Sequence, residues 1–352
     1  MSLFVHFYFH SVRVLLVVLA LLMFPSCGFM AQSFQTAADD EEKNDTSKKF
    51  FDPVAKELGG RNFMTGDRVL LSGSFYPGHA DEDTVPVILL HGQGKSREEF
   101  APLIAEMKKR GYAILAFDFR GHGESTTRFP TPREQMQLTN VNPGMGIPNV
   151  GMIPQPQTPS QAPQLIDYLE KDFTKTDYEN MYKFDILQFY RFLREENNAK
   201  RLNLNKLVIV GVGMGGTVGG RMTKQLWANT KGKNVRSLII VSPNYDSFSK
   251  ALFKDSKCFH RDVPLLMIVG QLDHLAKENA LSLRDDILGK EKRKEDHPTA
   301  MSSPVPVAEF PTERQGGDLL KESKMGVPQK IADYIDETLA KHKEKEFKWR
   351  KM

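Results

Sequence analysis

Short, almost wholly apolar runs alternate along this chain with segments that have helical spacing, and this alternation constrains the fold most strongly. Between two of these runs, Glu99–Arg110 spaces its apolar residues as one face of a helix. Strands that are apolar throughout are typical of a parallel sheet buried on both faces. The sequence therefore predicts an α/β fold with a mostly parallel central sheet and helices on both faces. The predicted strands are Val69–Tyr76, Val85–Leu90, Ala113–Phe117, Leu207–Val210, Ser237–Val241, Leu265–Val269 and Val305–Phe310.

Composition narrows the class of protein and the kinds of ligand. The 352 residues are 40% hydrophobic and 26% charged, which is enough for one large domain with a core. The net charge of +4 is small and the basic residues are interleaved with acids, so no nucleic-acid partner is expected. Cys27 and Cys258 are the only cysteines, and no metal-ligand spacing appears. We expect neither a cofactor nor a metal.

The N-terminal region has the pattern of an export signal. Arg13 precedes the apolar run Val14–Phe24, and small residues follow around Cys27. Residues 1–30 are thus predicted to be a signal peptide or an N-terminal anchor, which implies a periplasmic or extracellular protein. Membrane association through this segment and lipidation at Cys27 stay open as alternatives.

The remaining domain boundaries follow from changes in composition. Residues 31–49 form a flexible charged linker, residues 50–345 the folded domain, and residues 346–352 a basic tail that we expect to be a solvated or frayed end. Within the domain, residues 128–176 are dense in Pro, Gly, Gln and Asn and interrupt the alternation. This insertion is either a lid or disordered, and the lid alternative rests on the apolar Val150, Met152 and Ile153.

Four motifs carry a resemblance to a known family. Taken together they resemble an α/β-hydrolase of the serine aminopeptidase and monoglyceride lipase type, over roughly Asp67 to Leu339. In that family a Gly-x-Ser-x-Gly turn holds the nucleophilic serine in a strained strand-to-helix turn. Here Gly213 stands at the serine position. The motifs are His91-Gly92-Gln93-Gly94, Asp118-Phe119-Arg120-Gly121-His122-Gly123-Glu124-Ser125, Gly211-Val212-Gly213-Met214-Gly215-Gly216, and the run from Val263 to Asp273.

The resemblance also assigns the other positions of the site. It implies that the backbone amides of Gln93 and Met214 form the oxyanion hole and that Asp273 is the acid. The histidine of the family lies after the last strand, where this chain has Gln315. A glutamine cannot serve as the general base. The chain is therefore expected to be catalytically inactive and to act as a binding or scaffold protein for a small apolar ligand or a protein partner. In lacking the elbow serine it resembles the N-myc downstream-regulated proteins.

Two alternatives to an inactive protein stay open. Ser96, Ser125 or Ser242 could serve as a displaced nucleophile for small esters or lipids with support from Asp273, although each serine also fits a turn or a helix cap. Separately, the glycines in Gly211–Gly216 spell Gly-x-Gly-x-x-Gly, the pattern of dinucleotide-binding turns. The next strand ends without the acidic residue that would hold a ribose, which argues against nucleotide binding.

Four histidines were weighed as possible bases. His91 and His122 are each expected to fix a turn through hydrogen bonds. His274 adjoins Asp273, and His297 lies in a charged stretch of the chain. Either of these two could act as a base only along an unusual loop path.

Overall fold

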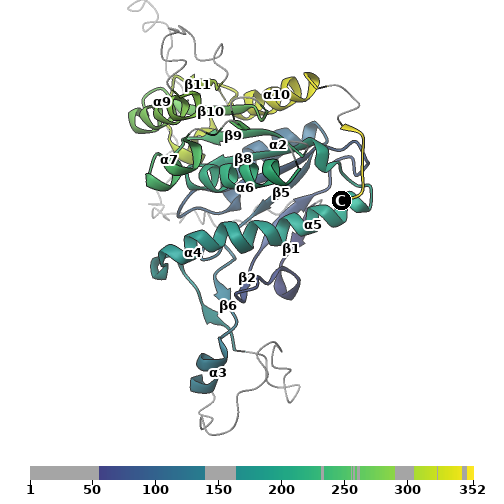
Figure 1. Ribbon diagram of the computed structural model, residues 1–352, viewed down its shortest axis with the longest axis vertical. Helices are drawn as coiled ribbons and strands as arrows, with labels where there is room; N and C mark the ends of the chain where they lie inside the picture. The colour runs from purple at the N-terminus through teal and green to yellow at the C-terminus, as the bar shows by residue number, and fades with distance from the viewer. Residues whose placement is uncertain are drawn as a thin grey trace, which may run out of the picture. The chain divides into compact units, whose positions relative to one another are not determined.

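The computed structural model describes residues 55–138, 164–230, 234–254, 256, 258–259, 262–289, 305–322, 324–342 and 347–352. Its main sheet has eight strands (Figure 1), which confirms the predicted mostly parallel sheet. The strands from β5 to β11 in the sheet run parallel, whereas β3 is antiparallel to β5 and β1 to β3. In spatial order they are β1 (Lys56–Leu58), β3 (Gly73–Tyr76), β5 (Ala113–Phe117), β4 (Pro86–Leu90), β8 (Leu207–Val212), β9 (Val235–Val241), β10 (Leu265–Gly270) and β11 (Val307–Phe310).

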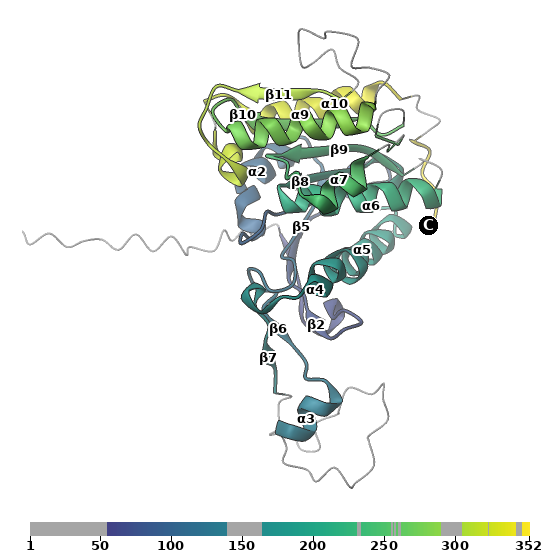
Figure 2. The same cartoon turned by 60° about the vertical axis from the view of Figure 1, so that its left-hand side comes forward.

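Helices cover both faces of this sheet (Figures 1 and 2), again as predicted. Alternate residues of one strand enter opposite cores, because successive side chains point to opposite faces. In β4, Val87 and Leu89 join one core cluster, while Ile88 and Leu90 join the other. One face carries α2 (Ala101–Lys109) and α10 (Val327–Ala340), and the other carries α5 (Ile186–Asn198), α6 (Met214–Thr230), α7 (Ser247–Phe253) and α9 (His274–Leu288).

The predicted strand Val69–Tyr76 is wrong in one respect, because the structure divides it between two sheets. The division falls at Ser72, whose amide donates to Ser125 Oγ and whose carbonyl accepts from the Asp118 amide, each at 2.9 Å. These bonds go to the turn after β5 and interrupt the ladder. The first part forms a separate antiparallel sheet made of β2 (Val69–Leu70), β6 (Thr127–Arg128) and β7 (Ile166–Asp167).

Parts of the Pro/Gly-rich insertion are described. They are α3 (Pro132–Leu138), β7, the 3-10 helix Glu170–Asp172 and α4 (Lys175–Asn180). Residues 139–163, with Val150, Met152 and Ile153, lie outside the described residues, so the choice between lid and disorder stays a prediction. The predicted signal peptide and linker also lie outside them. Among the helices that the structure describes, none is long and apolar enough to cross a membrane.

The expectation of a frayed end is wrong for residues 347–352. This segment returns to the folded domain and lies beside the C-terminal end of α5 (Figure 1). Asn197 Nδ2 donates to the Arg350 carbonyl at 3.0 Å, and Trp349 Nε1 donates to the Asn197 carbonyl at 3.0 Å. The charged side chains of the segment face solvent while its apolar side chains pack inward. A basic composition is therefore compatible with a packed segment.

Candidate functional site

The turn after β8 has the backbone of a nucleophile elbow but carries no side chain at the nucleophile position, which is Gly213. Gly213 has φ +50°, its amide donates to the Val241 carbonyl at 2.9 Å, and α6 begins at the next residue. This is the left-handed region that glycine enters without steric cost. A β carbon built at Gly213 would meet Asn244 Oδ1 at 3.5 Å and the Ser242 carbonyl oxygen at 3.7 Å, which are ordinary contacts. The turn therefore has room for a side chain that the sequence does not supply.

Ser242 occupies the matching point on the neighbouring strand. Val212 of β8 pairs with Val241 of β9, so Ser242 follows β9 as Gly213 follows β8. Its φ is +47°, which is rare for a residue other than glycine. Ser242 Oγ is buried and accepts from the Gly316 amide at 2.9 Å. This bond fixes the loop after β11 and favours a structural role for the serine.

The positions of the acid and the base reach the same edge of the sheet. Asp273 follows β10, and its Oδ1 accepts from the Ala276 amide at 3.0 Å, so the carboxylate caps α9. Gln315 precedes the 3-10 helix Gly316–Lys321, and its exposed side chain makes no capping bond. An amide therefore stands where a general base would be needed, and the Asp273 carboxylate is engaged with its own helix.

The loops around these positions lie close together. After β10, the Gln271 amide donates to the Phe310 carbonyl at 2.7 Å and the Leu272 amide donates to the Thr312 carbonyl at 3.2 Å. The loop after β11 is therefore held against the end of β10, and the Ser242–Gly316 bond attaches it to β9 as well. The structure thus brings the Gly213, Asp273 and Gln315 positions to one edge of the sheet.

The two positions assigned to the oxyanion hole lie at this edge. Gln93 is exposed in the turn after β4, and its Nε2 lies 3.5 Å from Tyr178 Oη. Met214 is the first residue of α6, where backbone amides have no partner inside the helix. The Met214 amide is therefore available to an acceptor from outside the helix, and its role in an oxyanion hole stays a prediction.

The glycines of the Gly-rich turn are explained by close packing. A β carbon at Gly215 would lie 2.0 Å from the Leu90 carbonyl oxygen, and one at Gly216 would lie 2.3 Å from Ile240 Cγ2. At Gly211 it would lie 2.4 Å from the Gly215 carbonyl carbon. The start of α6 thus approaches β4 and β9 too closely for side chains. Close packing thus accounts for Gly211 and Gly216, and the positive φ of +50° accounts for Gly213, so the Gly-x-Gly-x-x-Gly pattern needs no nucleotide to explain it.

His91 fixes a turn, as predicted. Its ring is fully buried, Nδ1 donates to the Gly92 carbonyl at 2.7 Å, and Nε2 accepts from the Phe119 amide at 2.9 Å. Burial lowers the pKa of His91 to about 3. The ring is therefore neutral near pH 7, and both of its nitrogens are occupied by the backbone.

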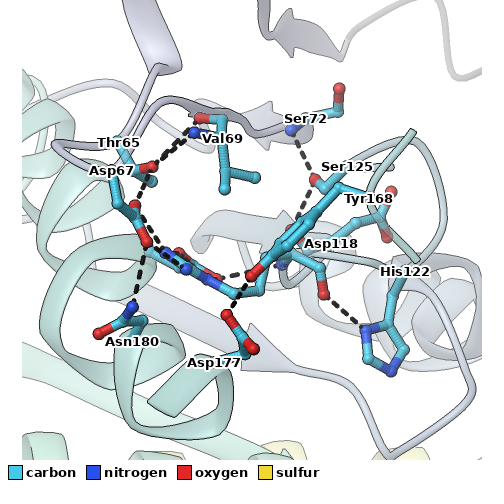
Figure 3. Close-up of polar contacts among 12 residues, drawn as sticks. Thr65, Asp67, Val69, Ser72, Asp118, His122, Ser125, Tyr168, Asp177 and Asn180 are labelled. Atoms are coloured by element: carbon cyan, nitrogen blue, oxygen red, sulfur yellow. Dashed lines mark hydrogen bonds and ion pairs between the residues drawn. The ribbon is translucent and has the colours of Figure 1, made fainter. Parts of the chain in front are cut away.

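His122 also has the predicted structural role. Nδ1 donates to the Arg120 carbonyl at 2.8 Å (Figure 3), and Nε2 lies 3.0 Å from Glu170 Oε2. The ring thus joins the turn after β5 to the described end of the insertion. Of the other histidines, His274 is exposed at the start of α9, and His297 lies outside the described residues.

Ser96 and Ser125 are cap and turn residues. Ser96 Oγ accepts from the Glu98 amide at 3.4 Å at the start of the 3-10 helix Arg97–Phe100. Ser125 is fully buried, and its hydroxyl donates to the Asp118 carbonyl at 2.8 Å while accepting from Ser72 (Figure 3). Both interactions agree with the turn or cap roles that the sequence suggested.

A buried ion-pair cluster next to this site was missed from the sequence. The Arg120 side chain is 0% exposed and binds Asp185, also 0% exposed, with Nη2 and Oδ1 2.7 Å apart. Arg120 Nη1 lies 2.5 Å from Asp67 Oδ2, which also accepts from Asn180 Nδ2 at 3.1 Å (Figure 3). Asp185 ends the π-helical turn Met181–Asp185, and burial raises its pKa to about 6. In the sequence, Arg120 stands out only as part of the motif Asp118–Ser125, and no local pattern connects it to Asp185.

Glu99 is a second buried group that the sequence analysis did not select. Its Oε1 accepts from the Gly92 amide at 2.6 Å, and its Oε2 is buried without a hydrogen-bond partner among the described residues. A β carbon at Gly317 would lie 2.0 Å from this Oε2, so a side chain there would have to displace the Glu99 carboxyl group. Burial raises the pKa of Glu99 to about 7. The carboxyl group lies between the turn after β4 and the loop after β11.

A metal centre finds no support in the part of the chain that the structure describes. Within those residues, no group of three or more His, Cys, Asp or Glu side chains is placed to hold a metal ion. The described cysteine, Cys258, is buried and unbridged.

Comparisons with known proteins agree with the fold. A family model described as alpha/beta hydrolase fold matches residues 85–257. The esterase Pf2001 of Pyrococcus furiosus is 17% identical, with 80% of this chain and 92% of that chain covered and a TM-score of 0.47. A dienelactone hydrolase from Anabaena variabilis is 14% identical, with 82% of this chain and 98% of that chain covered and a TM-score of 0.48. The mouse alpha/beta hydrolase domain-containing protein 10 is 13% identical, with 80% of this chain and 98% of that chain covered and a TM-score of 0.44. No curated protein matches the chain.

Proposed function

We propose that this protein, a member of the α/β-hydrolase fold superfamily, binds a small apolar ligand or a protein partner without hydrolysing it. The observation that carries this proposal is Gly213, which has the backbone of the elbow but no nucleophile. Gln315 supports it, because a glutamine cannot take a proton from a hydroxyl group. In subtilisin, loss of the nucleophile alone lowers kcat by about a million-fold.

The geometry around Gly213 supports binding as the remaining role. The amide of Met214 has no partner inside α6, and the space beside Gly213 is bordered by the Asn244 amide group. A short ester could place its carbonyl oxygen near such donors. Without a nucleophile and a base, the bound ester would stay intact.

The catalytic part of the proposal is tested with a fluorophosphonate probe and p-nitrophenyl butyrate. We expect neither the wild type nor Gly213→Ser to be labelled or to release nitrophenol above the buffer rate. An active serine hydrolase serves as the positive control for the probe. Labelling of wild-type Ser96, Ser125 or Ser242, mapped by mass spectrometry, would instead establish a displaced nucleophile.

The binding part is tested by equilibrium dialysis with the same ester. We expect intact p-nitrophenyl butyrate to be retained by the wild type and released by Asn244→Phe, whose ring would fill the space beside Gly213. Both proteins should have the same melting temperature. Equal retention by the two would contradict a ligand site at this turn.

We also propose that the protein is exported. The support is the N-terminal pattern of Arg13, the apolar run Val14–Phe24 and the small residues that follow. Cell fractionation with and without residues 1–30 tests this proposal. A full-length chain that stays in the cytosol would contradict it.

A further inference from the structure

The segment Phe347–Met352 lies against a surface at the amino ends of β8 and β9. Asn205 precedes β8 and Asn234 precedes β9, and the end of α5 completes the surface. Figure 1 shows the yellow end of the chain beside α5. Five asparagine side chains bind the segment, and we refer to them as the asparagine surface: Asn197, Asn198, Asn203, Asn205 and Asn234.

Most of these bonds are made to the backbone of the segment. Four asparagine amide groups donate to four carbonyl oxygens at 2.6 to 3.0 Å, and Asn198 Oδ1 also accepts from the Met352 amide at 2.8 Å. Bonds to the main chain contribute affinity for a peptide, whereas selection between peptides comes from contacts with its side chains. The donor and acceptor pairs are Asn203 with Phe347, Asn205 with Lys348, Asn197 with Arg350, and Asn198 with Met352.

The asparagine side chains are held in place by bonds to their own part of the domain. Asn197 Oδ1 accepts from the Leu204 amide at 3.0 Å, and Asn203 Oδ1 accepts from the Asn205 amide at 3.0 Å. Both side chains are fully buried with the segment in place. Because their oxygen atoms are fixed in this way, their Nδ2 atoms point toward the segment. The surface is therefore preorganised to bind a backbone.

Side chains of the segment alternate between the surface and solvent. Phe347 and Trp349 are partly buried, whereas Lys348 and Arg350 are exposed. Lys200 Nζ lies 5.0 Å from the centre of the Trp349 ring. The Phe347 ring is contacted in the same way by Lys206 at 5.5 Å and Arg236 at 5.1 Å. These cation–π contacts favour aromatic residues two positions apart.

We propose that the asparagine surface is a peptide-binding site, and that it takes up from solution peptides with two aromatic residues in alternate positions. Its occupant in this structure is the chain's own segment 347–352. None of the contacts requires a covalent connection between the segment and the surface. The attached segment competes with a free peptide, because tethering gives it an effective concentration of about the millimolar range.

The test uses the full-length chain with the substitutions Phe347→Ser and Trp349→Ser, which weaken the attached competitor. A labelled peptide with the sequence of residues 347–352 is titrated and followed by fluorescence anisotropy. We expect its dissociation constant for this double variant to be at least tenfold lower than for the wild type. A peptide of equal charge with serine at both aromatic positions should not bind.

Two controls decide what the titration means. Adding Asn203→Ala and Asn205→Ala to the double variant should weaken peptide binding at least tenfold. A folded double variant that binds neither peptide, or binds both equally well, would overturn the proposal.

If the double variant does not fold, hydrogen exchange of residues 347–352 is measured in the wild type instead. Excess acetylated peptide should accelerate this exchange, and an unchanged rate would overturn the proposal.

Discussion

The two ends of the parallel sheet use their buried polar groups differently. At the carboxyl ends of the strands, Arg120, Ser242 and Glu99 bind groups in neighbouring loops and hold those loops together. At the amino ends, Asn197 and Asn203 direct their amide groups to a segment that is distant in sequence. The two regions therefore differ in the partners of their buried polar groups, which are neighbouring loops at the carboxyl ends and a sequence-distant segment at the amino ends.

The contrast also bears on where function resides. The fold places chemistry at the carboxyl edge, where a parallel α/β sheet normally binds its ligands. In this chain Gly213 provides no side chain at the elbow of that edge, while the opposite edge holds the chain's own segment 347–352. We therefore expect substitutions of the buried polar groups at the carboxyl edge to act on stability, and those at the amino edge to act on attachment of the segment.

The largest effect is expected at the carboxyl edge from Asp185→Ala. The substitution leaves the Arg120 guanidinium without its fully buried partner, and breaking a buried pair in this way costs about 3 to 5 kcal/mol. Urea denaturation measures the change in the free energy of unfolding. Asp67→Ala is the matched control, and we expect a smaller loss because the Asp67 side chain is 29% exposed. Equal losses would mean that burial does not decide the strength of this cluster.

A second effect, dependent on pH, is expected at Glu99. Its pKa is raised from 4.5 to about 7 in the folded chain, so the folded state holds this proton more tightly than the unfolded state. The contribution of Glu99 to stability is therefore present below about pH 4.5 and is lost as the pH rises to about 7, by roughly 2 to 3 kcal/mol. Lys95, Asp318 and Lys321 also act on this carboxyl group.

The measurement compares Glu99→Gln with the wild type by denaturation between pH 5 and pH 8. We expect the variant to gain stability relative to the wild type as the pH rises, because glutamine carries no charge to bury. Glu98→Gln alters an exposed neighbour and should leave the pH dependence as it is. Parallel curves for the wild type and Glu99→Gln would show that this carboxyl group is not the origin of the dependence.

The smallest effect is expected at the amino edge from Asn203→Ala. The variant loses the bond to the Phe347 carbonyl and the bond that Asn203 Oδ1 accepts from the Asn205 amide, and the first of these contributes about 1 kcal/mol to the free energy of unfolding. A double-mutant cycle with the Phe347→Ser and Trp349→Ser variant isolates this contribution. In that background we expect Asn203→Ala to cost less. The same cost in both backgrounds would mean that Asn203 acts only within the domain.

The sequence predicted what depends on local pattern. The strands Ala113–Phe117 and Leu207–Val210 are apolar throughout, and the turn at Gly213 follows from its glycines, so each was found where expected. The division of Val69–Tyr76 was not predictable in this way, because it depends on bonds from Ser72 to a turn that is distant in sequence.

Long-range polar contacts explain the rest of what was missed. Asn203 and Phe347 are 144 residues apart, and Arg120 and Asp185 are 65 apart. An asparagine near a turn resembles any other turn residue. Three of the six residues in 347–352 are Lys or Arg, which favoured a solvated tail, whereas the aromatic residues between them decide the packing.

The room beside Gly213 gives the chain a use in protein engineering. A β carbon there has no close contact, so a new side chain meets mainly the cost of its backbone conformation, of the order of 1 to 3 kcal/mol. Reactive side chains could be introduced at Gly213 one at a time, because the backbone of the turn already has the conformation of a nucleophile elbow. If the proposed lack of hydrolysis holds, the separate contributions of nucleophile, base and oxyanion donors can then be measured against the unsubstituted protein.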